Sequence, residues 1–311
     1  MKDHRVVFMG TPVFAVPILE AIIEKYNVVG VVTQPDNIVN GLPKYSPVKE
    51  IALKNNIKII QPTKIKSEFF EVIELKPDIV ITCAYGQIIP SEILDYPTYG
   101  CINVHASLLP KLRGGAPIHR ALINGHAETG ITIMYMNKSM DTGDIISQVS
   151  TKILDEDDLK TLHDRLSIMG KDLLMSTLPD IFLGKSKRIK QDSSQATYAP
   201  NIKREDEKID FSKSSWEIYN KVRGLYPSPG AYFLYEGKTC KLYKCRIGDG
   251  YYGDNYIGEI VKIYSDGFGI KTSNGEIIVT DLQLEGKKRM LASVFLNGIQ
   301  DKSRFIGKIV E

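Results

Sequence analysis

Short apolar runs alternate with longer amphipathic stretches in the first half of the chain. The runs are rich in valine and isoleucine and bounded by glycine, proline or asparagine, which is typical of strands; they cover residues 5–9, 28–33, 57–60, 78–85 and 101–105. Between them, apolar residues recur at helical spacing over residues 14–26, 48–55, 68–76 and 118–124. This alternation predicts a mostly parallel sheet with helices on both faces. Functional residues in such folds gather at the carboxyl ends of the strands.

The alternation changes after residue 116. The pattern then predicts a strand at residues 131–136, a polar loop at 137–143 and a second strand at 145–153. One long helix is predicted after them, at residues 158–182. The stretch 184–207 is charged and poor in large apolar residues, which favours a linker. We therefore expect a first domain over 1–184, a linker over 185–207 and a second domain over 208–311.

The last hundred residues are strand-like. After one short helix at 216–222, apolar and polar residues form short runs separated by Asp-Gly and Asn-Gly turns; these runs are residues 231–235, 239–245, 256–263, 268–272 and 276–282. So many short strands in so small a region predict a β-barrel, of which the OB-fold is a type that binds nucleic acids.

Composition and charge separate the two parts further. No run of about 18 consecutive apolar residues could span a membrane, so we expect no membrane contact. The four cysteines lack the common zinc or redox spacings, so reduced thiols and a cytoplasmic location are expected. Residues 1–184 carry a net charge of −3, whereas residues 185–311 carry +6. This offset indicates a polyanionic partner for the second part.

The most informative segment ends the strand at 101–105. Asn103 and His105 lie two residues apart, so on a strand both side chains project from the same face. An amide donor beside an imidazole suits stabilisation of an oxyanion during direct attack on a carbonyl. In the alternative interpretation, Asn103 caps the following loop and His105 is a hydrogen-bonded histidine at the strand end.

A second candidate lies in the polar loop at 137–143. Asp141, in the sequence Asp141-Thr142-Gly143, could orient His105 and pass a proton through water. Two alternatives stay open. Asp-Thr-Gly also occurs in aspartic proteases, although these need two such aspartates and this chain has one copy. Asp141 could equally stabilise a tight turn through its own side chain.

Other motifs add little. The turn at Gly10-Thr11-Pro12 follows the first strand but lacks the G-x-G-x-x-G spacing, so it does not support dinucleotide binding. The remaining histidines have no metal-ligand spacing with cysteines or carboxylates, and we predict no metal site.

Taken together, the motifs resemble the 10-formyltetrahydrofolate-dependent formyltransferases. The signature consists of Asn103-x-His105, Ser107-Leu108-Leu109-Pro110, Arg113-Gly114 and Asp141-Thr142-Gly143. Similarity to the members that act on methionyl-tRNA extends over nearly the whole chain, through MGTP at 9–12, TQPD at 33–36, AETG at 127–130 and VRGLYPSPG at 222–230. In those members a basic insertion after the Gln-Pro-Asp motif contacts the acceptor end of tRNA, whereas residues 37–44 here carry only Lys44.

The resemblance implies a Rossmann-like formyltransferase domain followed by a small OB-like β-barrel that helps to hold tRNA. It assigns catalysis to Asn103, His105 and Asp141, and contacts with the folate to Ser107, Leu108, Leu109 and Pro110. The expected reaction moves the formyl group of 10-formyltetrahydrofolate, a cosubstrate, to the α-amino group of initiator methionyl-tRNA for translation initiation. We expect a monomer that needs no metal.

Three other functions remain open at this stage. The same catalytic half could formylate a different amine, such as a nucleotide-linked amino sugar or glycinamide ribonucleotide. It could also hydrolyse the formyl folate and release formate. A protein that binds RNA or folate without catalysis is the third possibility. The positively charged barrel favours tRNA, because a small amine gives no reason for about 100 further residues of this kind.

Overall fold

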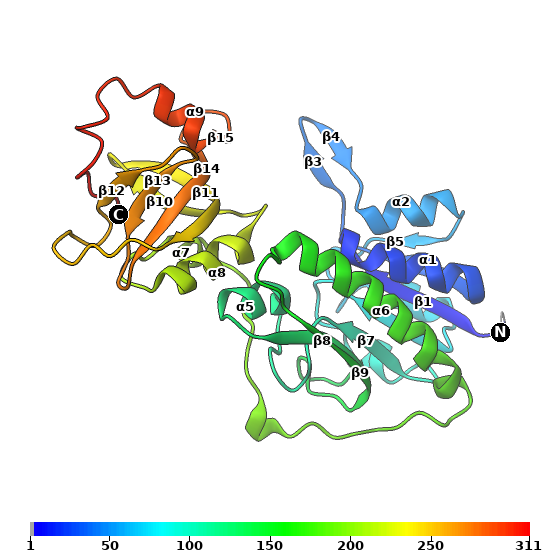
Figure 1. Cartoon of the computed structure of the whole chain (residues 1–311). Helices are drawn as coiled ribbons and strands as arrows, with labels where there is room; N and C mark the ends of the chain where they lie inside the picture. The colour runs from blue at the N-terminus through cyan, green and yellow to red at the C-terminus, as the bar shows by residue number, and fades with distance from the viewer. Residues whose placement is uncertain (1–2) are drawn as a thin grey trace. The chain divides into compact units, whose positions relative to one another are not determined.

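The computed structural model describes residues 3–311, which divide into two compact units. The first contains the chain as far as Pro117, together with Glu128–Lys152 and His163–Pro200. The second contains Ile118–Ala127, Ile153–Leu162 and Asn201–Glu311. Figure 1 shows the elements of each unit in sequence order. The second unit thus includes two short segments that precede its main part in the chain.

A mixed sheet forms the centre of the first unit, with strand order β5-β2-β1-β6-β7-β8-β9. Its strands are β1 (Arg5–Gly10), β2 (Asn27–Val32), β5 (Ile59–Ile60), β6 (Ile79–Cys83), β7 (Cys101–His105), β8 (Glu128–Tyr135) and β9 (Ile145–Lys152). The strands from β5 to β7 pair in parallel, and β8 and β9 are added antiparallel. The parallel strands are almost continuous apolar runs because helices cover both of their faces.

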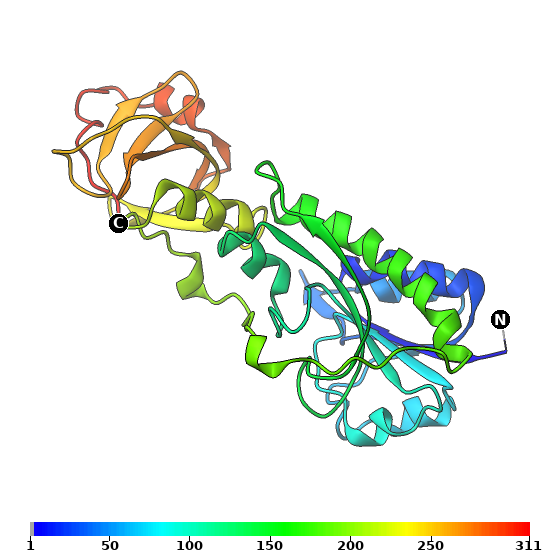
Figure 2. The ribbon, with the colours of Figure 1, turned by 60° about the horizontal axis from the view of Figure 1, so that its bottom comes forward.

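The helices of this unit form the two outer layers. They are η1 (Val13–Ala15), α1 (Val16–Lys25), α2 (Pro47–Lys54), α3 (Phe70–Glu74), α4 (Ser91–Leu94), α6 (Leu159–Phe182) and η2 (Ser193–Gln195). Figure 2 shows α1 and α6 on one side of the sheet and the helices of residues 70–94 on the other. On that other side, Val72 of α3 and Ile93 of α4 pack against Val7 and Val80 of the sheet.

A small hairpin follows β2, where the sequence pattern predicted no strand. It consists of β3 (Asn37–Val39) and β4 (Leu42–Lys44), joined by Asn40 and Gly41, both with positive φ. The sequence carries the signal for this turn, because Asn-Gly between apolar residues favours a two-residue hairpin. Its side chains are exposed, so the hairpin lacks the buried apolar face by which the other strands were predicted.

The second unit is built on an antiparallel sheet with strand order β10-β11-β14-β13-β12, and β15 pairs with β14. Its elements are α5 (Pro117–Ile123), α7 (Arg204–Glu207), α8 (Ser215–Leu225), β10 (Ala231–Tyr235), β11 (Lys238–Gly248), β12 (Ile260–Ile263), β13 (Phe268–Lys271), β14 (Glu276–Leu284), β15 (Met290–Leu291) and α9 (Ala292–Asn297). Helix α8 begins with a capping box, in which Ser214 and Glu217 each accept from the other's backbone N–H.

The end of the chain joins the two edges of this sheet. Lys308 O accepts from the backbone N–H of Ile260, the first residue of β12, and Glu311 exchanges two backbone hydrogen bonds with Leu234 of β10. The strands therefore enclose one apolar core, which includes Phe233, Leu242, Ile277 and Phe305. The expected fold class, a mostly parallel α/β domain followed by a small antiparallel barrel, is confirmed. Across residues 3–311, no helix is long and apolar enough to cross a membrane.

Candidate active site

Strand β7 presents the two residues that the sequence singled out on one face. Asn103 lies opposite Thr82 of β6, and the Thr82 hydroxyl donates a hydrogen bond of 2.8 Å to Asn103 Oδ1. This contact leaves Asn103 Nδ2 to donate elsewhere. His105 ends the strand, so its ring stands where the sheet gives way to a loop.

The imidazole of His105 lies between a carbonyl and a carboxylate, and its side chain is only 6% exposed. Nε2 is 3.1 Å from Leu112 O. A carbonyl only accepts hydrogen bonds, so Nε2 carries the proton of the neutral ring. Nδ1 is 3.7 Å from Asp141 Oδ1. The free lone pair of the ring therefore faces the carboxylate, and a proton taken up there completes an ion pair.

Asp141 reaches this place from the loop between β8 and β9, and its side chain is 13% exposed. Its backbone has a φ of 53°, in the left-handed region that aspartate tolerates better than most residues. Its second carboxylate oxygen, Oδ2, accepts a 2.8 Å hydrogen bond from Gly114 N. The fold thus brings His105 and Asp141 together across 36 positions of sequence. Their catalytic roles stay a prediction.

A buried threonine forms hydrogen bonds with the backbone of the loop that is expected to contact the folate. Thr132 of β8 donates to Ser107 O at 2.6 Å and accepts from Leu109 N at 3.1 Å. Gln148 of β9 adds hydrogen bonds to Leu109 O and to Thr132 Oγ1. The Ser107 hydroxyl donates to Lys111 O. These polar groups shape the loop itself, and a folate contact for Ser107, Leu108, Leu109 and Pro110 stays a prediction.

Polar residues after position 190 also line this region, and no motif pointed to them. Thr197 Oγ1 accepts from Leu112 N, Ala199 N donates to Arg113 O, and Ala199 O accepts from Ala116 N. Gln191 contacts the loop of Asp141. Part of the stretch expected to be a linker, residues 191–199, is therefore hydrogen-bonded to the loops that follow β7 and β8. The division at 185–207 itself stays a prediction.

The cysteines are poor candidates for nucleophiles. Burial raises the pKa of Cys101 to about 12 and that of Cys240 to about 12, and it raises the pKa of Cys83 and Cys245 as well. Thiols with such pKa values remain protonated at neutral pH. Within the described part of the chain, no three histidine, cysteine or carboxylate side chains are grouped to hold a metal ion.

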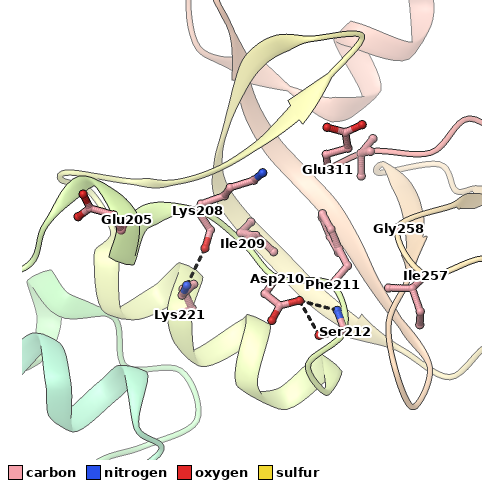
Figure 3. A pocket seen from close by; sticks show the side chains of 11 residues that line it. Glu205, Lys208, Ile209, Asp210, Phe211, Ser212, Lys221, Ile257, Gly258 and Glu311 are labelled. Atoms are coloured by element: carbon pink, nitrogen blue, oxygen red, sulfur yellow. Dashed lines mark hydrogen bonds between the residues drawn. The ribbon is translucent and has the colours of Figure 1, made fainter.

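A hollow of about 530 Å³ in the second unit offers a different kind of lining (Figure 3). Lys221 Nζ donates to Lys208 O at one side, and Asp210 accepts from Ser212 nearby. Glu205 and Glu311 add carboxylates. Its lining residues include no imidazole or carboxamide.

Comparison with protein families and curated relatives agrees with this arrangement. Residues 4–178 match the formyl transferase family, and residues 201–300 match the formyl transferase C-terminal domain. The chain is 48% identical over 302 residues to the methionyl-tRNA formyltransferase of Bacillus subtilis (strain 168), covering 94% of both chains. It is 50% identical over 304 residues to that of Bacillus cereus (strain B4264), covering 94% of this chain and 95% of the relative.

Solved structures share the fold at lower identity. A methionyl-tRNA formyltransferase from Clostridium thermocellum aligns with a TM-score of 0.58 and 18% identity, over 91% of this chain and 99% of that one. An N-formyltransferase from Helicobacter canadensis, in complex with folinic acid and dTDP-3-aminofucose, aligns with a TM-score of 0.68 and 23% identity, over 90% and 99%. With both domain matches and close relatives along its length, this chain belongs to the formyl transferase family.

Proposed function

We propose that the protein transfers the formyl group of 10-formyltetrahydrofolate to the α-amino group of initiator methionyl-tRNA. The observation that carries this proposal is the 48% identity to methionyl-tRNA formyltransferases over 94% of the chain. The juxtaposition of His105 and Asp141 supports it, since the same residues make up the predicted catalytic group. The reaction would take place in the cytoplasm, and the protein would act as a monomer.

The amine needs little activation before it attacks. An α-amino group has a reference pKa of about 7.7 to 8.0, and esterification of the carboxyl group lowers it, so a large fraction is neutral at cellular pH. Its lone pair forms a bond to the formyl carbon, and the carbonyl electrons move onto oxygen. Asn103 Nδ2 donates to that oxyanion, and the imidazole of His105 lies beside it on the same face of β7.

The second half of the reaction expels the folate. The oxyanion collapses, the bond between the formyl carbon and N10 breaks, and N10 takes up a proton. The proton lost by the attacking amine leaves through water towards Asp141, whose carboxylate lies beside the imidazole of His105. Atoms and charges balance, because one proton leaves the amine and one arrives at N10.

The alternatives from the sequence are less well supported. An amino sugar or another small amine would leave the net positive charge of residues 185–311 unexplained, whereas the relatives that share both domains act, by their names, on methionyl-tRNA. The likeness to the sugar N-formyltransferase is at 23% identity and concerns the fold alone. Hydrolysis to formate needs the same oxyanion contacts, so an assay must separate it from transfer.

One assay tests the proposal directly. The protein is incubated with 10-formyltetrahydrofolate and, in parallel, methionylated initiator tRNA, methionylated elongator tRNA, an amino sugar nucleotide or no acceptor. We expect rapid formylation of the initiator tRNA and only slow release of formate without acceptor. Faster formylation of a small amine than of the initiator tRNA would contradict the proposal.

A further inference from the structure

Gln191 forms hydrogen bonds with the backbone of the loop that carries Asp141. Its Nε2 donates two hydrogen bonds, of 2.9 Å to Asp141 O and 2.8 Å to Gly143 O. Its Oε1 accepts two others from the guanidinium of Arg113, at 3.1 Å from Nε and 2.7 Å from Nη2. The side-chain amide of Gln191 thus donates both of its N–H groups and accepts two hydrogen bonds at its oxygen.

This arrangement admits only one orientation of the amide. Turning the amide over would set its N–H groups against the guanidinium and its oxygen against two carbonyls, so every contact would become repulsive. A glutamate at position 191 could accept from Arg113 but could not donate to Asp141 O or Gly143 O. Among uncharged side chains of this length, only glutamine offers an acceptor and two donors in this order.

Arg113 strengthens the hydrogen bonds that Gln191 donates to the loop of Asp141. Its side chain is only 5% exposed, and no ion pair of the described residues includes it, so Gln191 is a principal acceptor for its buried charge. A cation that donates to the amide oxygen polarises the amide and strengthens its N–H groups as donors. The two carbonyls that Gln191 holds flank Thr142, and one belongs to Asp141 itself.

The position of Asp141 depends on the backbone that Gln191 holds. Asp141 has a left-handed backbone, which costs free energy for any residue with a side chain. Its carboxylate accepts from Gly114 N and lies 3.7 Å from His105 Nδ1. Without the two hydrogen bonds from Gln191, the loop can relax and carry the carboxylate away from the imidazole.

We propose that Gln191, clamped by Arg113, is a positioning residue that holds Asp141 against His105. This inference rests on the proposed function, because it assigns Gln191 to the same reaction. Gln191 touches none of the reacting atoms and acts through Asp141. A misplacement of about 1 Å can cost around a hundredfold in rate, so the expected loss on breaking the clamp is tenfold to about a hundredfold in kcat.

The test combines two variants with a matched control. Gln191→Leu removes donors and acceptor, and Gln191→Glu keeps the contact with Arg113 but removes the donors. Gln195→Leu is the control, since Gln195 is exposed and bonds only locally, to Asp192. We expect both Gln191 variants to lower kcat while the KM values for tRNA and folate stay within about threefold. The control should retain wild-type kcat.

A double variant shows whether Gln191 acts through Asp141. In an Asp141→Asn background, Gln191→Leu should lower kcat by no more than twofold, because the group that it positions is already lost. A loss that multiplies with that of Asp141→Asn would overturn the proposal. So would wild-type kcat in folded Gln191→Leu, or a failure of both Gln191 variants to fold, which would make the residue purely structural.

A spectroscopic measurement separates this inference from the proposed function. The ¹H and ¹⁵N signals of the His105 ring, assigned with His105→Gln, should move in Gln191→Leu in the direction seen for Asp141→Asn. Unchanged signals would refute the positioning role even if methionyl-tRNA is formylated. If the wild-type protein formylates another amine instead, the proposed function fails, and the ring signals still decide the role of Gln191.

Discussion

Two side chains of strand β7 stabilise the developing negative charge in the proposed reaction, and each can be removed alone. Asn103→Ala deletes the amide that faces the oxyanion, and His105→Ala deletes the imidazole beside it. Loss of one such group commonly costs a hundredfold or more in turnover. We predict a fall of about a hundredfold in kcat for each variant, measured with methionylated tRNA under saturating folate.

Folding of these two variants supplies the control. Asn103 accepts one side-chain hydrogen bond, from Thr82, and His105 is the last residue of β7, so we expect thermal unfolding within a few degrees of the wild type. Near-normal turnover in both variants would remove the site from β7. A large loss of stability would mean that His105 serves chiefly as a hydrogen-bonded residue at the strand end.

Asp141→Asn separates charge from geometry. Asparagine tolerates the left-handed backbone at this position and can still accept from Gly114 N, so the loop should keep its shape. What disappears is the negative charge 3.7 Å from the ring of His105. We predict a strong fall in kcat with a nearly unchanged Kd for the folate, measured by quenching of protein fluorescence. Wild-type activity would reduce Asp141 to a turn residue.

The sequence pointed to the candidate catalytic residues but not to the residues that hold them in place. Asn103, His105 and Asp141 stand out because few other uses suit an amide, an imidazole and a carboxylate at strand ends. Thr132 and Gln191 offer no such signal. The partners of Gln191 lie 48 to 78 positions away in the chain, so only the folded structure shows that a polar residue in a polar stretch belongs to the site.

At the scale of helices and strands, the sequence prediction agrees best with the structure where the element is buried. Strand β7 begins and ends where the apolar run predicted, at Cys101 and His105. The exposed hairpin β3–β4 was missed although Asn40-Gly41 signals its turn, because the prediction relied on apolar runs. Helix α3 is shorter than predicted and spans only Phe70–Glu74. Apolar periodicity locates faces that pack and says less about where a short surface helix begins and ends.

Gly114 tests how closely two segments of the first unit approach. Its φ of 122° suits glycine alone, and a Cβ there would lie 2.7 Å from Ala199 O. We predict that Gly114→Ala lowers the free energy of unfolding by about 2 kcal/mol or more, measured by urea denaturation, and reduces kcat because Gly114 N also binds Asp141.

Gly184→Ala is the matched control for Gly114→Ala. Gly184 also has a positive φ, of 68°, but a Cβ would meet nothing within 4 Å. We expect it to cost about 1 kcal/mol from backbone strain alone and to leave kcat unchanged. Equal losses of stability in the two variants would contradict a close approach at Ala199.

A bidentate ion pair fastens the helix α5 segment within the second unit. Arg120 donates to both oxygens of Asp206, and Asp206 also accepts from Lys203 N at the start of α7. The pKa of Asp206 lies below its ordinary value of 3.8, chiefly because of the hydrogen bonds from Arg120. The carboxylate therefore adds stability that is present above pH 3.8 and is lost as the pH falls through the lower, folded pKa.

Asp206→Asn should remove this dependence on pH. We predict that the variant loses about 1 kcal/mol of unfolding free energy at pH 7, and that the difference from the wild type shrinks below pH 3.8. Urea denaturation of both proteins at a series of pH values measures it. A difference that stays constant into acid would show that the charge of Asp206 contributes nothing.

At the scale of the whole molecule, the division of charge indicates how the large substrate is held. Residues 185–311 carry +6 whereas residues 1–184 carry −3, so the attraction for phosphates is concentrated in the part of the chain after the first domain. The hairpin after β2 cannot share much of it, because Lys44 is its one charged side chain and Ile38 and Leu42 are exposed there. Affinity for tRNA should therefore depend mainly on residues 185–311.

Counterion release makes this division measurable. Each neutralised phosphate adds nearly one unit to the slope of log affinity against log salt, so several contacts predict a tRNA affinity that falls steeply between about 50 and 200 mM salt. Replacing an exposed lysine of the second unit that contacts a phosphate, such as Lys238→Gln or Lys287→Gln, should lower that slope by about one. The same change at Lys44 should alter it less. A flat response to salt, or a slope set chiefly by Lys44, would place the phosphate contacts elsewhere.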